Sequence, residues 1–293
     1  MRQLTGRRHS PPANTPSTCS SREFKQRSYG KTTSSGPVER TIIEVDGLRL
    51  NAEVHYPGGL GPHPALCICH GVPAKRTPDP TDRGYALLAE KYSSHGFVTL
   101  IFNFRGSGES EGNFNIVGWT RDLKAATDYL YDLDKIDRSR LSLMGFSGGA
   151  ATVIYCAARD QRVSSVVSCA CPARFFDISE FSMIEEFLGN CRQVGIIRDS
   201  DFPPSVEEWA QGFAEVSPLN WIDRIAPRPI FIVHGANDET INPSHAQRLY
   251  EKAGKPKDIA IIEGGVHKLR LSEAAVDAAL SWLKKVNGLA ESS

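Results

Sequence analysis

The chain has 293 residues, 40% of them hydrophobic and 23% charged, which is the composition of an ordinary globular protein with a sizeable core. Lysine plus arginine and aspartate plus glutamate each number 34, so no overall field draws the chain to nucleic acid or to an anionic membrane. No stretch approaches the roughly 20 apolar residues that cross a bilayer. We therefore expect neither a nucleic-acid partner nor a membrane span.

Residues 1–37 differ in composition from the rest of the chain. They carry seven basic residues against one acidic residue and are rich in serine, threonine and proline. Such a segment cannot bury enough apolar surface to offset the entropy of ordering, so a disordered basic tail is predicted. An organelle transit peptide is the alternative, but no amphipathic pattern supports it, and the apolar core of a secretion signal is missing. We expect a cytoplasmic protein.

From residue 38 to residue 289, strand patterns alternate with helix patterns. Residues 41–57 predict a hairpin around Asp46-Gly47, and the apolar run 65–71 is typical of a strand buried on both faces. Further strands are predicted at 97–104, 140–146, 163–171, 229–234 and 258–263, and helices at 84–95, 119–133, 148–159, 243–252 and 272–286. The alternation predicts an α/β domain with a mostly parallel eight-stranded sheet and helices on both faces.

The alternation stops between residues 172 and 226. A segment of about 55 residues with many phenylalanines and tryptophans is too long and too aromatic to be a linker. We interpret it as a small cap or lid inserted into the α/β domain. The aromatic residues are expected to pack the cap against the body rather than to bind substrate.

Residues 145–149 read Gly-Phe-Ser-Gly-Gly and lie between a predicted strand and a small-residue helix. This context makes the G-x-S-x-G pattern a nucleophile elbow, in which Ser147 occupies a strained turn. Gly145 and Gly149 have no Cβ, so the strand and the helix can pass close to the serine. The alternative is a glycine-rich loop without chemistry, since the bare pattern arises easily by chance.

A serine hydroxyl needs a general base that is itself oriented by an acid. His267 follows the last predicted strand and Asp238 follows the strand before it, and such loops leave a parallel sheet at the same edge as the elbow. The order Ser147, Asp238, His267 is the order of a nucleophile-elbow triad. Each residue alone could be an ordinary loop residue, and Asp177 is the rival acid.

An oxyanion formed on the substrate needs fixed N–H donors. Gly148, directly after the serine, supplies one amide, and the loop after the strand 65–71 should supply the other. Pro73 has no N–H, so Val72 is the expected donor, and Gly71 permits a close approach. His70 is expected to brace this loop rather than to transfer protons.

Two pairs of cysteines, at 67 and 69 and at 171 and 169, stand two residues apart in apolar runs. A metal site was weighed, but neither pair has the spacing of a zinc knuckle, and buried small side chains are the preferred interpretation. We expect no metal and no cofactor. The odd total of seven cysteines indicates free thiols in a reducing compartment.

Together these segments resemble a serine hydrolase of the α/β-hydrolase fold over residues 41–287. The match rests on His70-Gly71, the segment 103–110, the elbow 145–149, Asp238 and His267. It is similar to single-domain esterases of the cinnamoyl or feruloyl type and to the serine aminopeptidase or monoacylglycerol lipase branch. Asn103 and Ser107 depart from the D-x-R-G-H-G-x-S loop common in the family, which affects the expected substrate class, and Arg105 is expected to anchor that loop.

The resemblance implies hydrolysis of a carboxylic ester through an acyl-enzyme, with a small ester or a short peptide as partner. Peptide or amide hydrolysis is the first alternative, because the same triad serves both reactions. A non-catalytic binding protein that kept the fold is the second. Serine at the elbow argues against the branches that resemble this fold but use aspartate or cysteine there. The acyl group, the alcohol and the oligomeric state are not indicated by the sequence.

Overall fold

An eight-stranded sheet orders the molecule. The computed structural model describes residues 36–74, 84–175 and 181–290, and within them the strands follow the order β1-β2-β4-β3-β5-β6-β7-β8. The hairpin strands β1 and β2 pair antiparallel, β2 also pairs antiparallel with β4, and the other neighbours pair parallel. The strands are β1 (Val38–Val45), β2 (Leu48–His55), β3 (His63–Cys69), β4 (Val98–Phe102), β5 (Ile136–Phe146), β6 (Val163–Cys169), β7 (Ile230–Gly235) and β8 (Lys257–Ile262). The predicted fold class is confirmed.

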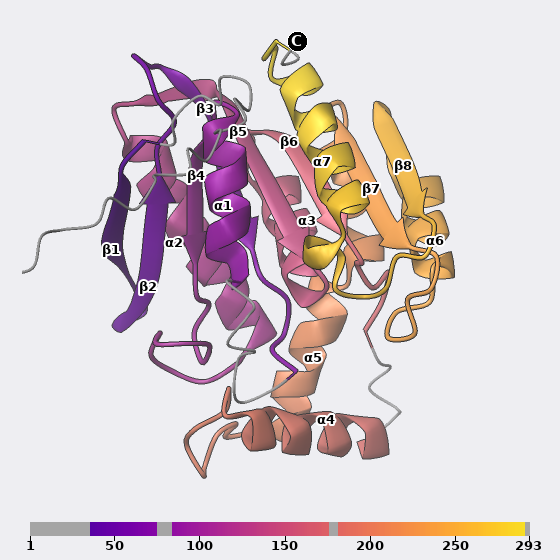
Figure 1. The fold of residues 1–293 in the computed structure, drawn as a ribbon. Helices are drawn as coiled ribbons and strands as arrows, with labels where there is room; N and C mark the ends of the chain where they lie inside the picture. Colours follow the sequence, from indigo (N-terminus) through magenta and orange to yellow (C-terminus); the bar gives the residue numbers. More distant parts are fainter. Residues whose placement is uncertain (1–35, 75–83, 176–180, 291–293) are drawn as a thin grey trace, which may run out of the picture. The chain divides into compact units, whose positions relative to one another are not determined.

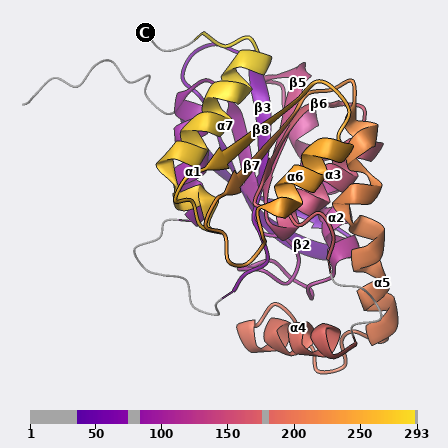
Figure 2. The same cartoon turned by 90° about the vertical axis from the view of Figure 1, so that its right-hand side faces the viewer.

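Helices cover both faces of the sheet (Figure 2). On one face lie α1 (Gly84–Ser94) and α7 (Glu273–Val286), and on the other lie α2 (Ile116–Asp132), α3 (Gly148–Arg159) and α6 (Ser244–Lys252). Successive side chains of a strand point to opposite faces, so Leu66 and Ile68 of β3 pack in the α1/α7 layer while Cys67 and Cys69 pack in the other. Burial on both faces explains why β3 is a continuous apolar run.

Several element boundaries differ from the predicted ones. Strand β5 begins at Ile136, four residues before the predicted start. The polar residues after Ile136, of which Arg138 and Ser139 are exposed, obscure the strand pattern in the sequence. Helix α2 begins at Ile116 rather than residue 119, because the side chain of Asn115 caps it by accepting a hydrogen bond from the Gly118 amide at 2.8 Å. Strand β4 ends at Phe102, two residues earlier than predicted.

The described residues of the segment 172–226 form two helices, α4 (Phe181–Val194) and α5 (Val206–Val216), and two short 3₁₀ turns, η1 (Pro218–Asn220) and η2 (Ile222–Ile225). In Figure 1, α4 and α5 lie below the sheet, on the side toward which β6 and β7 point. Trp209 and Phe213 of α5 pack against Phe114 of the body, and the Trp209 indole donates a hydrogen bond to the Phe114 carbonyl at 3.1 Å. The Arg198 guanidinium donates to three carbonyls of the loop after β4, those of Gly106, Gly108 and Ser110.

Residues 1–35 of the predicted basic tail lie outside the described residues. In the part of the chain that the structure describes, no helix combines the length and the apolar character needed to cross a membrane. All elements of the sheet and its covering helices fall within one compact unit that extends from Thr33 to Ser293.

Candidate active site

Ser147 lies at the sharp turn between β5 and α3. Its backbone has φ 52° and ψ −123°, a left-handed conformation that is strained for a residue with a side chain. The turn leaves no room for Cβ atoms: one built on Gly145 would lie 2.6 Å from the Gly149 oxygen, and one on Gly149 would lie 2.2 Å from the His70 oxygen. The Ser147 amide donates to the Cys169 carbonyl at 2.9 Å, which ties the turn to β6. The elbow geometry is therefore fixed by its neighbours.

Three side chains that are far apart in the sequence form a line of hydrogen bonds at the carboxyl edge of the sheet. The His267 Nε2 atom lies 3.0 Å from the Ser147 hydroxyl, and the His267 Nδ1 atom lies 2.8 Å from Asp238 Oδ2. The other carboxylate oxygen, Asp238 Oδ1, accepts hydrogen bonds from the Thr240 and Ile241 amides, both at 2.9 Å. This arrangement can move a proton from the hydroxyl to an imidazole whose tautomer a carboxylate holds.

The two partners of the serine differ in exposure. The Asp238 side chain is fully buried, whereas the His267 side chain is 23% exposed. His267 belongs to the loop between β8 and a 3₁₀ turn, η3 (Leu269–Leu271), and Asp238 belongs to the loop after β7. A buried acid beside a partly open base suits a site that a substrate must enter. The rival acid Asp177 lies outside the described residues.

The loop after β3 passes directly over the elbow. A Cβ built on Gly71 would lie 3.0 Å from the Ser147 Cβ, and a Cβ built on Gly148 would lie 3.8 Å from the Val72 backbone nitrogen. Gly148 is the first residue of α3, where an amide has no acceptor within its own helix. Within the described chain, neither this amide nor that of Val72 donates to another group. The two predicted oxyanion donors are thus neighbours beside the serine.

Both ring nitrogens of His70 form hydrogen bonds with backbone groups. Its Nδ1 lies 2.7 Å from the Gly71 carbonyl, and its Nε2 accepts a hydrogen bond from the Phe104 amide at 3.1 Å. The ring also packs edge-on against Trp119. Burial lowers the pKa of His70 to about 4, so the imidazole is neutral at pH 7 and joins the loops after β3 and β4.

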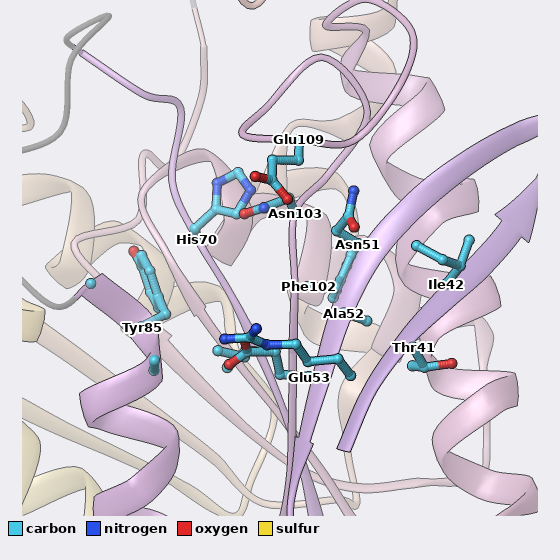
Figure 3. A pocket seen from close by; sticks show the side chains of 14 residues that line it. Thr41, Ile42, Asn51, Ala52, Glu53, His70, Tyr85, Phe102, Asn103 and Glu109 are labelled. Carbon is cyan, nitrogen blue, oxygen red and sulfur yellow. The ribbon is translucent and has the colours of Figure 1, made fainter. Parts of the chain in front are cut away.

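A pocket of about 610 Å³ adjoins this region (Figure 3). His70 and Tyr85 lie on one wall, and Thr41 and Ile42 of the hairpin lie on the other. Asn103 and Glu109 of the loop after β4 also line it, so the departure at Asn103 from the common loop pattern borders this cavity.

Arg105 anchors the loop after β4 through a buried charge pair with Asp122 and a partly exposed one with Asp46. Its guanidinium donates to Asp122 from Nε at 2.9 Å and from Nη2 at 2.6 Å, and Nη2 also donates to Asp46 at 2.8 Å. The Arg105 carbonyl accepts a hydrogen bond from the Trp119 indole at 3.2 Å. The hairpin, helix α2 and this loop are therefore joined at one side chain that does not contact Ser147, His267 or Asp238.

His234, which was not among the predicted site residues, lies against Asp238. The His234 Nε2 atom lies 3.2 Å from Asp238 Oδ2. The spacing of four residues between this histidine and the acid, with a glycine after the histidine, was the available signal. Among the described residues, no group of three or more histidine, cysteine, aspartate or glutamate side chains could hold a metal ion.

Comparison with known proteins agrees with the fold. Residues 85–289 match the prolyl oligopeptidase family (Peptidase_S9). The quorum-quenching protein AidA of Acinetobacter baumannii is 30% identical over 149 residues, which are 49% of this chain and 47% of AidA, so the match spans about half of that protein.

Two solved structures share the architecture. The α/β hydrolase GrgF from Penicillium sp. sh18 has a TM-score of 0.67 at 19% identity and covers 86% of this chain and 99% of its own. Est1E from Butyrivibrio proteoclasticus, solved with ferulic acid bound, has a TM-score of 0.62 at 20% identity and covers 84% and 96%. At this identity the likeness establishes the fold alone.

The sheet order, the elbow and these matches define a serine hydrolase of the α/β-hydrolase fold. The matched segment covers well over half of the chain, and the chain therefore belongs to the prolyl oligopeptidase family. The class expected from the sequence is confirmed at this level. The feruloyl esterase and serine aminopeptidase branches stay predictions.

Proposed function

We propose that the protein hydrolyses carboxylic esters with Ser147 as nucleophile, His267 as general base and Asp238 as the acid that orients it. The observation that carries this proposal is the continuous line from the Ser147 hydroxyl through both nitrogens of His267 to Asp238, with links of 3.0 Å and 2.8 Å. Distances of about 2.6–3.2 Å between nucleophile and base are those that proton transfer requires.

The reaction proceeds in two halves. Ser147 attacks the carbonyl carbon while His267 takes its proton, and the imidazolium that forms is stabilised by Asp238. The amides of Val72 and Gly148 stabilise the oxyanion. His267 then returns the proton to the leaving alcohol, and a water that it activates releases the acyl group from Ser147. No step requires a metal or a cofactor.

A fluorophosphonate probe tests the nucleophile. We expect the parent protein to be labelled at Ser147, and labelling to be lost in Ser147→Ala and kept in the matched control Ser139→Ala, whose serine is exposed at the far end of β5. Absence of labelling on folded parent protein would favour the second alternative, a catalytically inactive binding protein of the same fold.

Peptide or amide hydrolysis is the competing activity, and membership of the prolyl oligopeptidase family favours it. The ester proposal is supported by Est1E, a protein of the same fold described with ferulic acid bound. Turnover of p-nitrophenyl acetate and butyrate should exceed turnover of aminoacyl p-nitroanilides under equal conditions. Faster cleavage of the anilides would reverse the assignment and favour an aminopeptidase-like enzyme.

We also infer that the protein resides in a reducing compartment such as the cytoplasm. The six cysteines of the described residues are free, and burial raises the pKa of Cys171 to about 12, so that thiol stays protonated and inert. Imaging a fluorescent fusion in the native host tests the location, and a signal confined to the cell exterior would contradict it.

A further inference from the structure

His234 is the penultimate residue of β7, and its side chain is completely buried. Its Nε2 atom lies 2.8 Å from the Ile241 carbonyl and 3.2 Å from Asp238 Oδ2. The Ile241 carbonyl can only accept, so Nε2 carries a proton and donates it to this carbonyl, while the same N–H group lies within charge-pair distance of the Asp238 carboxylate. The Nδ1 atom is buried and has no hydrogen-bond partner among the residues that the structure describes. Because Nε2 donates a hydrogen bond and Nδ1 has no partner among these residues, the imidazole of His234 is held in a single tautomer, with its proton on Nε2.

Three N–H groups donate hydrogen bonds to the Asp238 carboxylate, and the His234 ring makes a fourth, longer contact with it. Two backbone amides, those of Thr240 and Ile241, donate to Oδ1, whereas the rings of His267 and His234 both reach Oδ2. A fully buried carboxylate needs such donors, because burial without them would disfavour its ionised form. The two histidine rings thus face the same oxygen, Oδ2. The negative charge on this oxygen that interacts with the His234 N–H is less available to His267.

We propose that His234 is a positioning residue that holds Asp238 Oδ2 in line with His267 and limits the negative charge that His267 meets. This inference rests on the proposed function, since it concerns the same proton transfer. A carboxylate oxygen that also faces the partly positive N–H of a second ring, here at 3.2 Å, has less tendency to take the proton from His267 Nδ1. His234 therefore sets the basicity of His267 without touching the substrate.

The charged and titratable groups around His234 fit a neutral donor. Asp238 and His267 face it from the loops after β7 and β8, and His245 of α6 interacts electrostatically with His234 and with Arg248. Burial lowers the pKa of His234, and the carboxylate of Asp238 opposes that effect. Burial also lowers the pKa of His245, whose Nδ1 accepts a hydrogen bond from the Ala173 amide at 2.9 Å.

The pH dependence of kcat/KM for an ester separates positioning from packing. His234→Leu removes the donor and keeps an apolar volume, so the carboxylate should favour the imidazolium form of His267 more strongly. We expect the acidic limb of the profile to move up by about one pH unit. His234→Gln can place an amide N–H where Nε2 lies, and we expect its limb to stay within about 0.3 pH unit of the parent. His95→Gln, on the end of α1, is the matched control.

A loss of activity in folded His234→Leu with an unmoved acidic limb would mean a structural role and overturn the inference. A measurement on the unchanged protein covers the case in which this variant does not fold. With ¹⁵N-labelled histidine, NMR should find His234 with its proton on Nε2 throughout the pH range of the kinetic profile. A proton on Nδ1 instead overturns the proposal. An inactive parent protein would count against the ester hydrolase alone, because the tautomer is measured independently of turnover.

Discussion

Two loops at the carboxyl edge of the sheet each carry a histidine, and the two side chains are built for different tasks. His70, after β3, is 8% exposed and gives both ring nitrogens to the backbone. His267, after β8, has a side chain that is 23% exposed and gives its nitrogens to a hydroxyl and a carboxylate. The same residue type in the same kind of loop thus takes its role from its partners.

The difference decides which ring can act as a base. The Nε2 lone pair of His70 is occupied by the Phe104 amide, and burial holds the pKa of the ring at about 4. The Nε2 lone pair of His267 faces the hydroxyl of Ser147, a group that can give up its proton during attack on a carbonyl. His70 is accordingly a brace for the oxyanion loop in our proposal, and His267 is the base.

Replacing His267 should produce the largest effect. We expect His267→Ala to lower kcat/KM for an ester by roughly 10⁴-fold or more, because the nucleophile loses its proton acceptor. The fold should remain, since the side chain is partly exposed. Steady-state kinetics with a circular dichroism check of folding measures this. Activity equal to that of the parent would remove His267 from the mechanism.

His70→Ala should act chiefly on stability. The change leaves the buried Phe104 amide without a partner and opens a space beside Trp119, which together should lower the free energy of unfolding by roughly 2–4 kcal/mol. Loss of the bond to Gly71 should reduce kcat about tenfold by loosening the Val72 amide.

Urea denaturation and kinetics on the same preparation separate the two effects. His95→Ala is the matched control. His95 follows α1 and contacts the Lys91 carbonyl, and its replacement should lower the free energy of unfolding by less than about 1 kcal/mol. A folded, stable His70→Ala that loses as much activity as His267→Ala would make the two loops equivalent and end the contrast between them.

The sequence predicted the sheet and the elbow because both depend on local pattern. The apolar run of β3 records burial on both faces, and the glycines at 145 and 149 record the closeness of strand and helix. The order of Ser147, Asp238 and His267 along the chain added the convergence that parallel strands enforce. These features can be predicted from local pattern and chain order, without knowledge of any distant contact.

Features that depend on how the loops fold were harder to predict. His234 lies in a buried strand, and its four-residue spacing from Asp238 was the sequence signal for a contact that forms when the loop after β7 folds back. The early start of β5 was not visible in the sequence because the four residues after Ile136 are polar and none of them is buried, so they show no alternation toward a core. The bounds of α4 and α5 were not predicted either, because their aromatic side chains pack against Phe114 of the body rather than against the sheet.

The smallest effect concerns pH. An ordinary histidine titrates near 6.5, and burial lowers the pKa of folded His70 to about 4, so between these values the unfolded chain binds a proton that the folded chain does not. The stability that His70 contributes is therefore complete above about pH 6.5 and is lost as the pH falls toward 4. At pH 5.5 the loss should be about 1.4 kcal/mol. The destabilisation by His70→Ala should consequently be smaller at pH 5.5 than at pH 8 by that amount, as measured by urea denaturation. The other buried histidines are present in both the parent protein and His70→Ala, so their effects on stability cancel in the difference. An equal destabilisation at the two pH values would contradict the prediction, because it would show that His70 takes up its proton as readily as an exposed ring.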